Sequence, residues 1–429
     1  MKKTETDFDV IVIGGGPSGM MAAGIAAEKG KRVLLLEKNE RLGDKLKATG
    51  GGRCNITNAE EDKEALLRHY GKAKDFLQSP FAQFGVADTF KFFETRSLPL
   101  VVEARKRAFP ATQKAEDVFR VLEKFMRAGK VTIKTGTKVV KLIKDNDQKV
   151  IGVITAGGPA LRSFSEAGVK YFASNFIFAT GGLSHPELGA TGDGFTWLRS
   201  LGHTVKESSP DIVPLAVKEK WVKDLSGVSL SFMKITFFLD GVKKFSKKGK
   251  ILFTHFGLSS SLILNSAREV KYLLQTGGTV TATIDTCPDT DIGSLEKQVI
   301  KILDQNKNKS LKNALPEISP DGLSPAIITL LAKKLDLEKK VHSVSKEERR
   351  VIVDLLKALP LTITGLMGFD RAVVSDGGVE LAEIDLRAMR SRLHPNIYVT
   401  GDLLNISRPS GGFSLQLCWT TGYVAGRSV

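Results

Sequence analysis

The segment from residue 9 to residue 37, DVIVIGGGPSGMMAAGIAAEKGKRVLLLE, constrains the fold of this chain more than any other feature. Residues 9–13 form a short apolar run of the kind found in parallel strands that are buried on both faces. Residues 20–29 contain no proline and predict a helix that ends at Gly30. Residues 32–36 predict a second strand. The segment therefore predicts a β-α-β unit.

Three glycines join the first strand to the helix in the pattern Gly14-x-Gly16-x-x-Gly19. In a dinucleotide-binding unit these glycines allow a tight turn, a close approach of the pyrophosphate and close packing of helix on strand. The unpaired N–H groups at the helix start favour the phosphates. Glu37 follows the second strand at about the spacing of an acid that binds an adenosine ribose. Because these features agree in register, we expect a bound nucleotide rather than an empty glycine-rich loop.

A second glycine-rich segment, residues 38–58 (KNERLGDKLKATGGGRCNITN), follows at once. The glycines at 50–52 permit unusual backbone angles and a close approach to a ligand, and Lys45 and Arg53 add positive charge beside them. A plain surface loop does not need three consecutive glycines before Arg-Cys-Asn, so we favour ligand contact. Cys54 has two interpretations, a thiol of lowered pKa or a small buried filler, and the second is the more frequent for a lone cysteine.

Several classes of protein are disfavoured by the composition. The three cysteines, Cys54, Cys287 and Cys418, are far apart, so we expect no CxxC dithiol, no zinc site and no disulfide framework. A flavin-disulfide reductase is therefore disfavoured, and no metal is predicted. The sequence has no run of 18 apolar residues and no export signal, so we expect no membrane partner and a cytoplasmic location.

The formal net charge of +16 is large enough to influence association. Five lysines fall within residues 243–250, and a second basic cluster lies within residues 333–350. An anionic substrate, an RNA or an acidic surface would each explain this charge. A solvated basic face explains it as well, and we favour that interpretation because no aromatic interleaving or RNA motif accompanies the lysines.

The length of 429 residues predicts two or three domains. Residues 60–127 are predicted to be mostly helical, and residues 131–178 to form short strands that lead to Thr180 and Gly181. Strand-like segments separated by turns begin near residue 210, and residues 294–356 predict charged helices.

The last seventy or so residues return to the nucleotide-binding pattern. Asp376-Gly377-Gly378 lies between two short strands and predicts a hairpin by its turn chemistry. Residues 396–402 predict a buried strand that ends in Gly401-Asp402. Gly411-Gly412 then opens a terminal helix whose free N–H groups are a second candidate contact for phosphate or flavin.

The chain carries five motifs: DVIVIGGGPSGMMAA, GDKLKATGGGRCNITN, ATGGLSHPELGATGDGF, THFGLSSS and YVTGDLLNISRPSGGFSLQLCWTTGYVAG. Together they resemble the bacterial family of BaiN-type NAD(P)/FAD-dependent oxidoreductases along nearly the whole chain. The resemblance implies an α/β fold with a Rossmann-like FAD-binding core of the two-dinucleotide-binding-domain flavoprotein type, and an inserted β-barrel-like plus helical domain. We predict an FAD-binding first segment at 1–205, a β-rich substrate domain at 206–290, a helical domain at 291–357 and an FAD-binding C-terminal segment at 358–429.

The resemblance also implies a set of cofactor-binding residues. The glycine motif and Glu37 would hold the adenosine half of FAD, Gly401-Asp402 the ribitol, and Arg53, Cys54 and Gly411-Gly412 would lie near the ring. The catalytic residues stay unassigned, with Arg53, Cys54 and His255 as candidates, and His255 is equally well explained as structural. The predicted cofactor-binding residues are Gly14, Gly16, Pro17, Ser18, Gly19, Glu37, Lys38, Lys45, Gly51, Gly52, Arg53, Cys54, Val139, Thr180, Gly181, Gly401, Asp402, Gly411, Gly412 and Phe413.

The leading functional hypothesis is an FAD-dependent oxidoreductase that moves a hydride between a small organic substrate and flavin N5. NADH or NADPH is an open choice of transient electron donor, because the sequence shows no second GxGxxG motif. The direction of the reaction, oxidase or dehydrogenase against reductase, and the oligomeric state are also open. An RNA-associated or RNA-modifying flavoprotein and a flavin-binding redox sensor are the alternatives.

Overall fold

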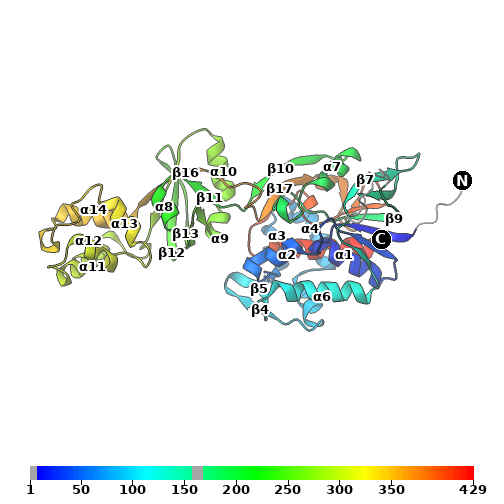
Figure 1. Ribbon diagram of the computed structural model, residues 1–429, viewed down its shortest axis with the longest axis horizontal. Helices are drawn as coiled ribbons and strands as arrows, with labels where there is room; N and C mark the ends of the chain where they lie inside the picture. The colour runs from blue at the N-terminus through cyan, green and yellow to red at the C-terminus, as the bar shows by residue number, and fades with distance from the viewer. Residues whose placement is uncertain (1–6, 157–167) are drawn as a thin grey trace. The chain divides into compact units, whose positions relative to one another are not determined.

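The computed structural model describes residues 7–156 and 168–429, so residues 1–6 and 157–167 of the predicted first segment lie outside the described part. The chain divides into two compact units (Figure 1). Unit 1 combines Met1–Pro210 with Val373–Val429, and unit 2 is Asp211–Ala372.

Unit 1 is built on a mixed sheet that has nine strands within the described residues. Its middle strands run parallel, and the predicted β-α-β unit forms their centre, because the first strand pairs in parallel with the second. Residues 10–12 are fully buried, as expected for a strand covered on both faces. The path through the sheet is β18 (Ile384–Asp385), β19 (Arg390–Ser391), β20 (Ile397–Val399), β9 (Lys170–Phe178), β1 (Phe8–Ile13), β2 (Val33–Leu36) and β6 (Thr132–Lys134), with β7 (Val139–Lys144) and β8 (Val150–Thr155) joined at β9.

Helices cover this sheet, and the first of them is packed between two others. The predicted helix after the glycine motif is α1 (Pro17–Glu28), which contacts both α6 (Ala115–Ala128) and α15 (Phe413–Ser428). The predicted terminal helix is therefore confirmed, and it brings the end of the chain onto the start. The other helices of unit 1 are α2 (Asp44–Ala48), α3 (Lys63–Arg68), α4 (Lys74–Gln83), α5 (Val86–Glu94) and α7 (Asp193–Ser200).

Of two predictions about local structure, the mostly helical character of residues 60–127 is confirmed and the hairpin at residues 376–378 is wrong. Residues 60–127 contain two short strands besides helices, because β4 (Leu100–Glu103) and β5 (Arg107–Pro110) pair with each other and with β3 (Thr57–Asn58). The predicted hairpin around residues 376–378 is one continuous strand, β17 (Val374–Val379), which pairs with β10 (Val205–Asp211).

The physical reason for the second difference is a close backbone contact. Gly377 has a φ of 97°, and a Cβ atom built there would lie 2.5 Å from the carbonyl oxygen of Glu207 in β10. Gly377 therefore lets β17 and β10 approach each other closely, and it does not reverse the chain.

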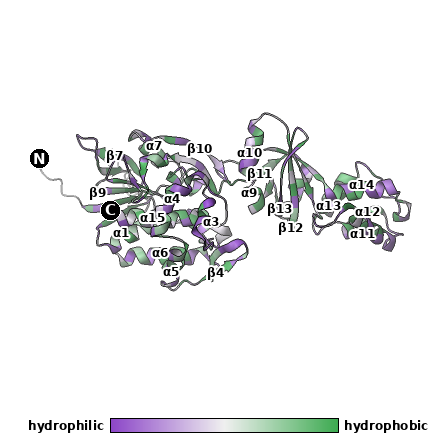
Figure 2. Ribbon diagram, turned by 180° about the vertical axis from the view of Figure 1, so that it is seen from behind, coloured by the Kyte–Doolittle hydropathy of each residue, from purple (hydrophilic) through white to green (hydrophobic). Residues whose placement is uncertain are grey.

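Unit 2 has its own core, built on a barrel that is closed within residues 211–372. Hydrophobic and hydrophilic residues alternate along its strands (Figure 2), as expected when one face of a strand is buried. The barrel order is β11 (Leu215–Val217), β14 (Gly257–Ser259), β13 (Val242–Thr254), β12 (Ser229–Leu239), β15 (Val280–Asp285) and β16 (Leu359–Leu366).

The last barrel strand lies beyond the predicted helical segment. Residues 358–372 were predicted with the C-terminal FAD-binding segment, but β16 pairs with both β15 and β11 and closes the barrel. Closure removes the exposed edges that β11 and β15 would otherwise present. The helices of unit 2 are α8 (Lys220–Asp224), α9 (Ser261–Leu264), α10 (Ala267–Gln275), α11 (Ile292–Gln305), α12 (Leu311–Ile318), α13 (Ser324–Leu331) and α14 (Lys346–Lys357).

Two glycines bring the backbones of α1 and α15 into direct contact. A Cβ atom at Gly422 would lie 2.4 Å from the Ser18 carbonyl oxygen, and one at Gly426 would lie 2.4 Å from the Ala22 carbonyl oxygen. Neither backbone oxygen can move without shifting α1. This contact therefore fixes the C-terminal helix on the nucleotide-binding helix.

Gly426→Ala is expected to lower the free energy of unfolding of unit 1 by about 1–3 kcal/mol through overpacking, which exceeds the roughly 1 kcal/mol gained in helix propensity. Urea unfolding followed by near-UV circular dichroism measures the change. Gly293→Ala in α11 is the control, since its Cβ would meet only the Asp291 side chain, at 3.3 Å. Equal stabilisation by both substitutions would contradict the packing.

A buried histidine ties the edge of the sheet to the loop after α7. His203 donates from Nδ1 to Glu383 (2.8 Å), and its Nε2 accepts from the Ser391 hydroxyl (2.9 Å). Burial lowers the pKa of His203 below 6.5, although Glu383 opposes this shift. The imidazole is therefore neutral in the folded protein at neutral pH.

The unfolded chain takes up a proton at this histidine near pH 6.5, while the folded chain resists it. Stability is therefore full above about pH 6.5 and falls as the pH decreases, by at most about 1.4 kcal/mol per pH unit for one proton. The pKa of Glu383 is also lowered, from 4.5, so the stability that this ionised carboxylate contributes is lost only at lower pH. His203→Gln should flatten the slope of unfolding free energy between pH 6.5 and 5. An unchanged slope would show that His203 is not the group that titrates.

Candidate functional site

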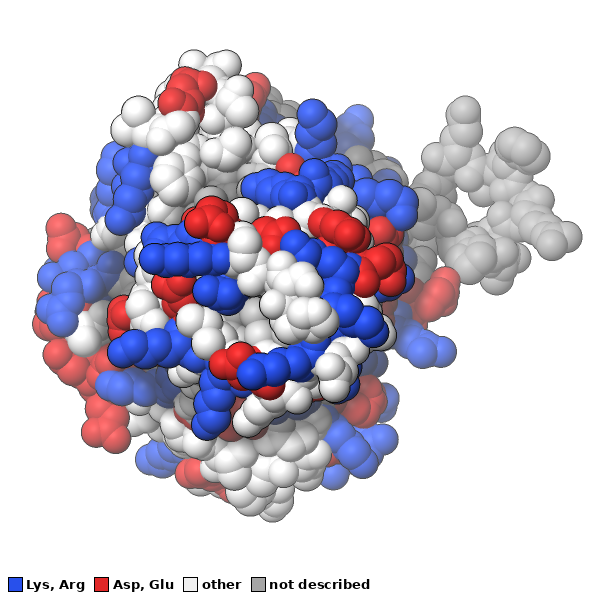
Figure 3. All heavy atoms as spheres, turned by 90° about the vertical axis from the view of Figure 1, so that its left-hand side faces the viewer, with Lys and Arg blue, Asp and Glu red and all other residues white. Residues whose placement is uncertain are grey.

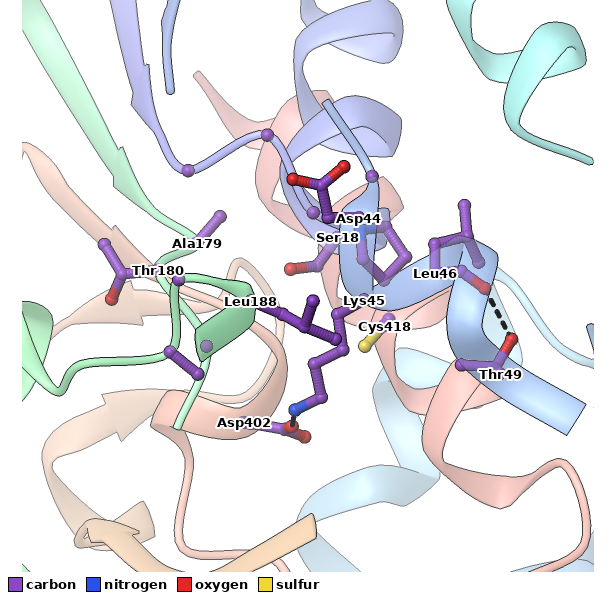
Figure 4. Close-up of a pocket in the computed structure, with 18 of the residues that line it drawn as sticks. Ser18, Asp44, Lys45, Leu46, Thr49, Ala179, Thr180, Leu188, Asp402 and Cys418 are labelled. Atoms are coloured by element: carbon purple, nitrogen blue, oxygen red, sulfur yellow. Dashed lines mark hydrogen bonds and ion pairs between the residues drawn. The ribbon is translucent and has the colours of Figure 1, made fainter. Parts of the chain in front are cut away.

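A groove in unit 1 lies at the carboxyl end of β1 (Figure 4). It consists of a main cavity of about 140 Å³ and an adjoining cavity of about 40 Å³. Both are lined by Gly14, Glu37, Thr180 and Gly189. The carboxyl end of a parallel sheet is where open α/β folds bind ligands.

The glycine motif forms one wall of the groove. A Cβ atom at Gly19 would lie 1.9 Å from the Gly14 carbonyl oxygen, so this glycine is required for the helix to start directly behind the strand. Gly14 has a φ of 108°, and its Cβ would lie 2.5 Å from the Ala179 carbonyl oxygen. A Cβ atom at Gly16 would meet no atom within 4 Å, so the backbone there borders open space. Pro17 and Ser18 at the start of α1 also line the main cavity.

Glu37 stands at the junction of the two cavities. One carboxylate oxygen accepts the Gly15 N–H (2.6 Å), and the other accepts the Asn39 N–H (2.8 Å). The carboxylate is thereby held against the glycine turn. Each oxygen keeps a further lone pair that can accept a hydroxyl hydrogen bond.

Two other predicted residues line the adjoining cavity. The ammonium of Lys38 pairs with Asp193 at 3.0 Å and also contacts Thr191. Val139 contributes an apolar wall beside Trp197. The structure thus brings Lys38 and Val139 to the Glu37 end of the groove.

A cluster of three charges lies at the main cavity. Lys45 extends to Asp402 (Figure 4), with 3.4 Å between ammonium and carboxylate, and it also contacts the Ser184 hydroxyl. The other Asp402 oxygen accepts from Arg408, whose side chain is only 1% exposed. Burial alone would raise the pKa of Asp402, but Arg408 and Lys45 outweigh it and hold the pKa below its ordinary value. The cluster therefore carries a net positive charge at the groove.

Several predicted residues do not line either cavity. The backbone of Gly401 is buried, and its N–H donates to Thr421 (3.0 Å). Gly51 and Gly52 are exposed and have φ values of 67° and 84°. Gly181, in contrast, lines the main cavity, and a Cβ there would meet nothing within 4 Å.

Arg53 is tied to neighbouring protein groups. Its guanidinium donates to Glu103 and to Gln113, both at 2.9 Å, and it stacks over the ring of Phe109 at 4.1 Å. Its side chain stays 39% exposed. The structure therefore shows Arg53 anchoring the β4–β5 hairpin.

Cys54 is fully buried and has a φ of 61°. Burial raises the pKa of its thiol to about 12, so it is protonated at neutral pH. Cys54, Cys287 and Cys418 are all free thiols. Cys418, which the sequence interpretation did not select, lines the main cavity from α15.

The start of α15 reaches the groove one residue later than predicted. Ser414 and Leu415 line the main cavity, whereas Gly411, Gly412 and Phe413 do not. A Cβ atom at Gly412 would lie 2.2 Å from the Thr57 carbonyl carbon, so this glycine is required by the packing of α15 on β3. That Gly411 and Gly412 lie near the flavin ring stays a prediction.

His255 belongs to unit 2. It is exposed in the turn between β13 and β14, and its ring lies edge-on to Phe256 with centroids 4.9 Å apart.

The sequence interpretation missed cavity residues that only the fold brings together. A lone leucine or serine carries no sequence signal for ligand contact, although Asn39 and Asp44 lie inside the segment already selected. The additional residues that line the main cavity include Asn39, Arg41, Asp44, Leu46, Thr49, Leu188, Val373, Val374, Ser414, Leu415 and Cys418.

Comparison with known proteins decides the family. The description "HI0933-like protein Rossmann domain" matches residues 8–428. The chain belongs to the HI0933-like family. The resemblance inferred from the sequence motifs is thus confirmed, and the match covers both segments of unit 1 and all of unit 2.

Full-length relatives of this HI0933-like chain have assigned activities. The chain is 31% identical to the 3-dehydro-bile acid delta(4,6)-reductase of Clostridium scindens, over 97% of this chain and 98% of the relative. It is 25% identical to the ribosomal RNA dihydrouridine synthase of Escherichia coli, over 98% of each chain. Among solved structures, the 3-ketosteroid delta1-dehydrogenase of Sterolibacterium denitrificans shares the fold with a TM-score of 0.54 and 12% identity, covering 98% of both chains.

The groove fits the FAD that this Rossmann-type fold binds. Gly16 leaves the turn before α1 open to a pyrophosphate, and Glu37 has acceptor capacity for a ribose. The hydroxyl of Thr180 is buried without a hydrogen-bond partner and belongs to a residue that lines both cavities. The chain is an FAD-dependent oxidoreductase.

Across the described residues, no helix is both long and apolar enough to cross a membrane.

Glu37→Gln is expected to weaken FAD binding by about 10- to 100-fold, because a carboxylate hydrogen bond is replaced by a neutral one while the Gly15 N–H keeps an acceptor. Titration of the apoprotein with FAD measures this change. Glu40→Gln removes an exposed charge three residues away and should leave the affinity unchanged. Equal affinities for wild type and Glu37→Gln would remove Glu37 from the binding site.

Proposed function

We propose that this protein reduces a carbon–carbon double bond that is conjugated to a carbonyl group in a small organic molecule. The observation that carries the proposal is the full-length similarity to a 3-dehydro-bile acid delta(4,6)-reductase, seen together with the cluster in which Lys45 and Arg408 share Asp402 at the groove. The uracil ring that a dihydrouridine synthase reduces also contains a double bond conjugated to a carbonyl. The two named activities therefore share one type of chemistry.

The charges at the groove suit this chemistry. When bound and reduced, FAD would supply the hydride. Addition of hydride to a conjugated alkene moves negative charge onto the carbonyl oxygen, and a preorganised positive potential lowers the barrier. Lys45, held by Asp402 and Ser184, contributes this potential together with the start of α15.

Apolar side chains at the same cavity favour exclusion of water. Leu46, Leu188, Leu415 and Val374 line the main cavity beside the charged cluster. A drier site strengthens the interaction of Lys45 with developing negative charge. We propose NADH or NADPH as the transient donor that reduces the flavin.

Anaerobic mixing tests the proposal. NADH or NADPH should bleach the visible flavin band, and a 3-oxo-4-ene steroid should restore it, because hydride passes from the flavin to the conjugated carbon. The matched saturated 3-oxo steroid should not restore the band, since it has no conjugated double bond. Restoration by oxygen alone, with neither steroid active, would contradict the proposed function.

A second candidate is reduction of uracil in RNA. Two observations favour it, the net charge of +16 and the full-length similarity to ribosomal RNA dihydrouridine synthases. The basic clusters of unit 2 weaken it, because acidic residues are interleaved with lysines on the face that carries α11–α14 (Figure 3). Lys309, Lys312 and Lys339 each pair with a glutamate there. Dihydrouridine formed from ribosomal RNA by the reduced protein, with no steroid reduction, would favour this candidate.

A further inference from the structure

The tip of the β4–β5 hairpin in unit 1 has an unusual backbone. Arg105 and Lys106 are consecutive residues with φ values of 62° and 56°. Residues other than glycine rarely adopt this left-handed conformation, because the Cβ atom crowds the backbone. Such strain persists where the surrounding structure enforces it, and it concentrates at ligand sites.

Two contacts tie this hairpin to neighbouring segments of unit 1. Arg53 anchors the hairpin through Glu103, as described above. The Asn58 amide donates both to the Arg105 carbonyl oxygen (3.3 Å) and to the Gly411 carbonyl oxygen (3.2 Å). Gly411 lies two residues before the start of α15, whose Ser414 lines the main cavity. The strained tip is therefore fixed to the segment that leads into the FAD groove.

The charges around the tip leave one cation without an acidic partner. Lys106 pairs with Glu60 (2.6 Å), while Arg107 and Arg53 both pair with Glu103. Arg105 is exposed, and in the described parts of the chain no carboxylate pairs with its guanidinium. Val102 on the same hairpin is 55% exposed. A free guanidinium next to an exposed apolar side chain matches an amphipathic anion.

We propose that Arg105 binds the carboxylate of a small amphipathic substrate, and that Val102 contacts the apolar body of that molecule. This proposal rests on the proposed reduction of a conjugated carbonyl compound and adds the anionic group by which the substrate is recognised. Arginine suits the task because its planar fork matches a carboxylate with two parallel hydrogen bonds. The left-handed backbone and the Asn58 contact fix the direction of the Cα–Cβ bond of Arg105.

The test compares a 3-oxo-4-ene steroid acid with its methyl ester. Binding to the oxidised FAD-loaded protein is measured by equilibrium dialysis, so no turnover is needed. The wild type should bind the acid about 10- to 100-fold more tightly than the ester, as expected for a charge-assisted hydrogen bond. Arg105→Gln should remove this preference and leave the affinity for the ester unchanged. Arg105→Gly should do the same, and it keeps the fold because glycine adopts the φ of 62° without strain.

Lys130→Gln is the matched control. Lys130 is also an exposed cation with a positive φ, 57°, and the acid preference should survive its removal. An equal preference for the acid in wild type and Arg105→Gln, or none in the wild type, would overturn the proposal. Binding of uridine-containing RNA that depends on Arg105, without any acid preference, would assign this residue to phosphate and overturn it as well. If the ester still reoxidises the reduced flavin, the proposed function stands even when the carboxylate site fails.

Discussion

The contact between Gly19 and the Gly14 carbonyl oxygen is the constraint on which the site depends. A side chain at Gly19 would separate α1 from β1, because its Cβ would lie 1.9 Å from that oxygen. With the helix start fixed at the strand end, α15 can pack on α1 through Gly422 and Gly426. The groove therefore forms where the first and last segments of the chain meet, and any loosening of this packing would change its walls.

Charge is distributed around this groove according to burial. Arg408 is buried and is balanced by Asp402, since an unpaired buried charge would cost several kcal/mol. Lys45 shares the same carboxylate but is 28% exposed, so it adds positive potential on the cavity side of the pair. Farther out, Arg105 lacks such a partner. The arrangement suits a reaction in which negative charge develops inside the groove and the substrate is anionic.

Structural features that depend on one short segment of the chain could be predicted from the sequence. The glycine motif, Glu37 and their flanking strands follow one another in register, so local spacing was sufficient. The tether from Arg53 to Gln113 could not be predicted in this way, because these residues are 60 positions apart and meet only after the hairpin forms.

Backbone packing also explains the errors. The segment Asp376-Gly377-Gly378 has the composition of a turn. In the structure, however, the absence of a side chain at Gly377 allows β10 to pack closely against it. Gly412 likewise serves contact with β3, while Ser414 and Leu415 in the first turn of α15 line the groove.

The identity of the extracted cofactor tests the central claim most directly. Chromatography of the flavin released by denaturing the purified protein should give FAD at about one molecule per chain, because the Gly14 to Glu37 unit recognises an adenosine diphosphate moiety. Release of FMN alone, or a colourless protein that FAD cannot reconstitute, would contradict the assignment of the groove.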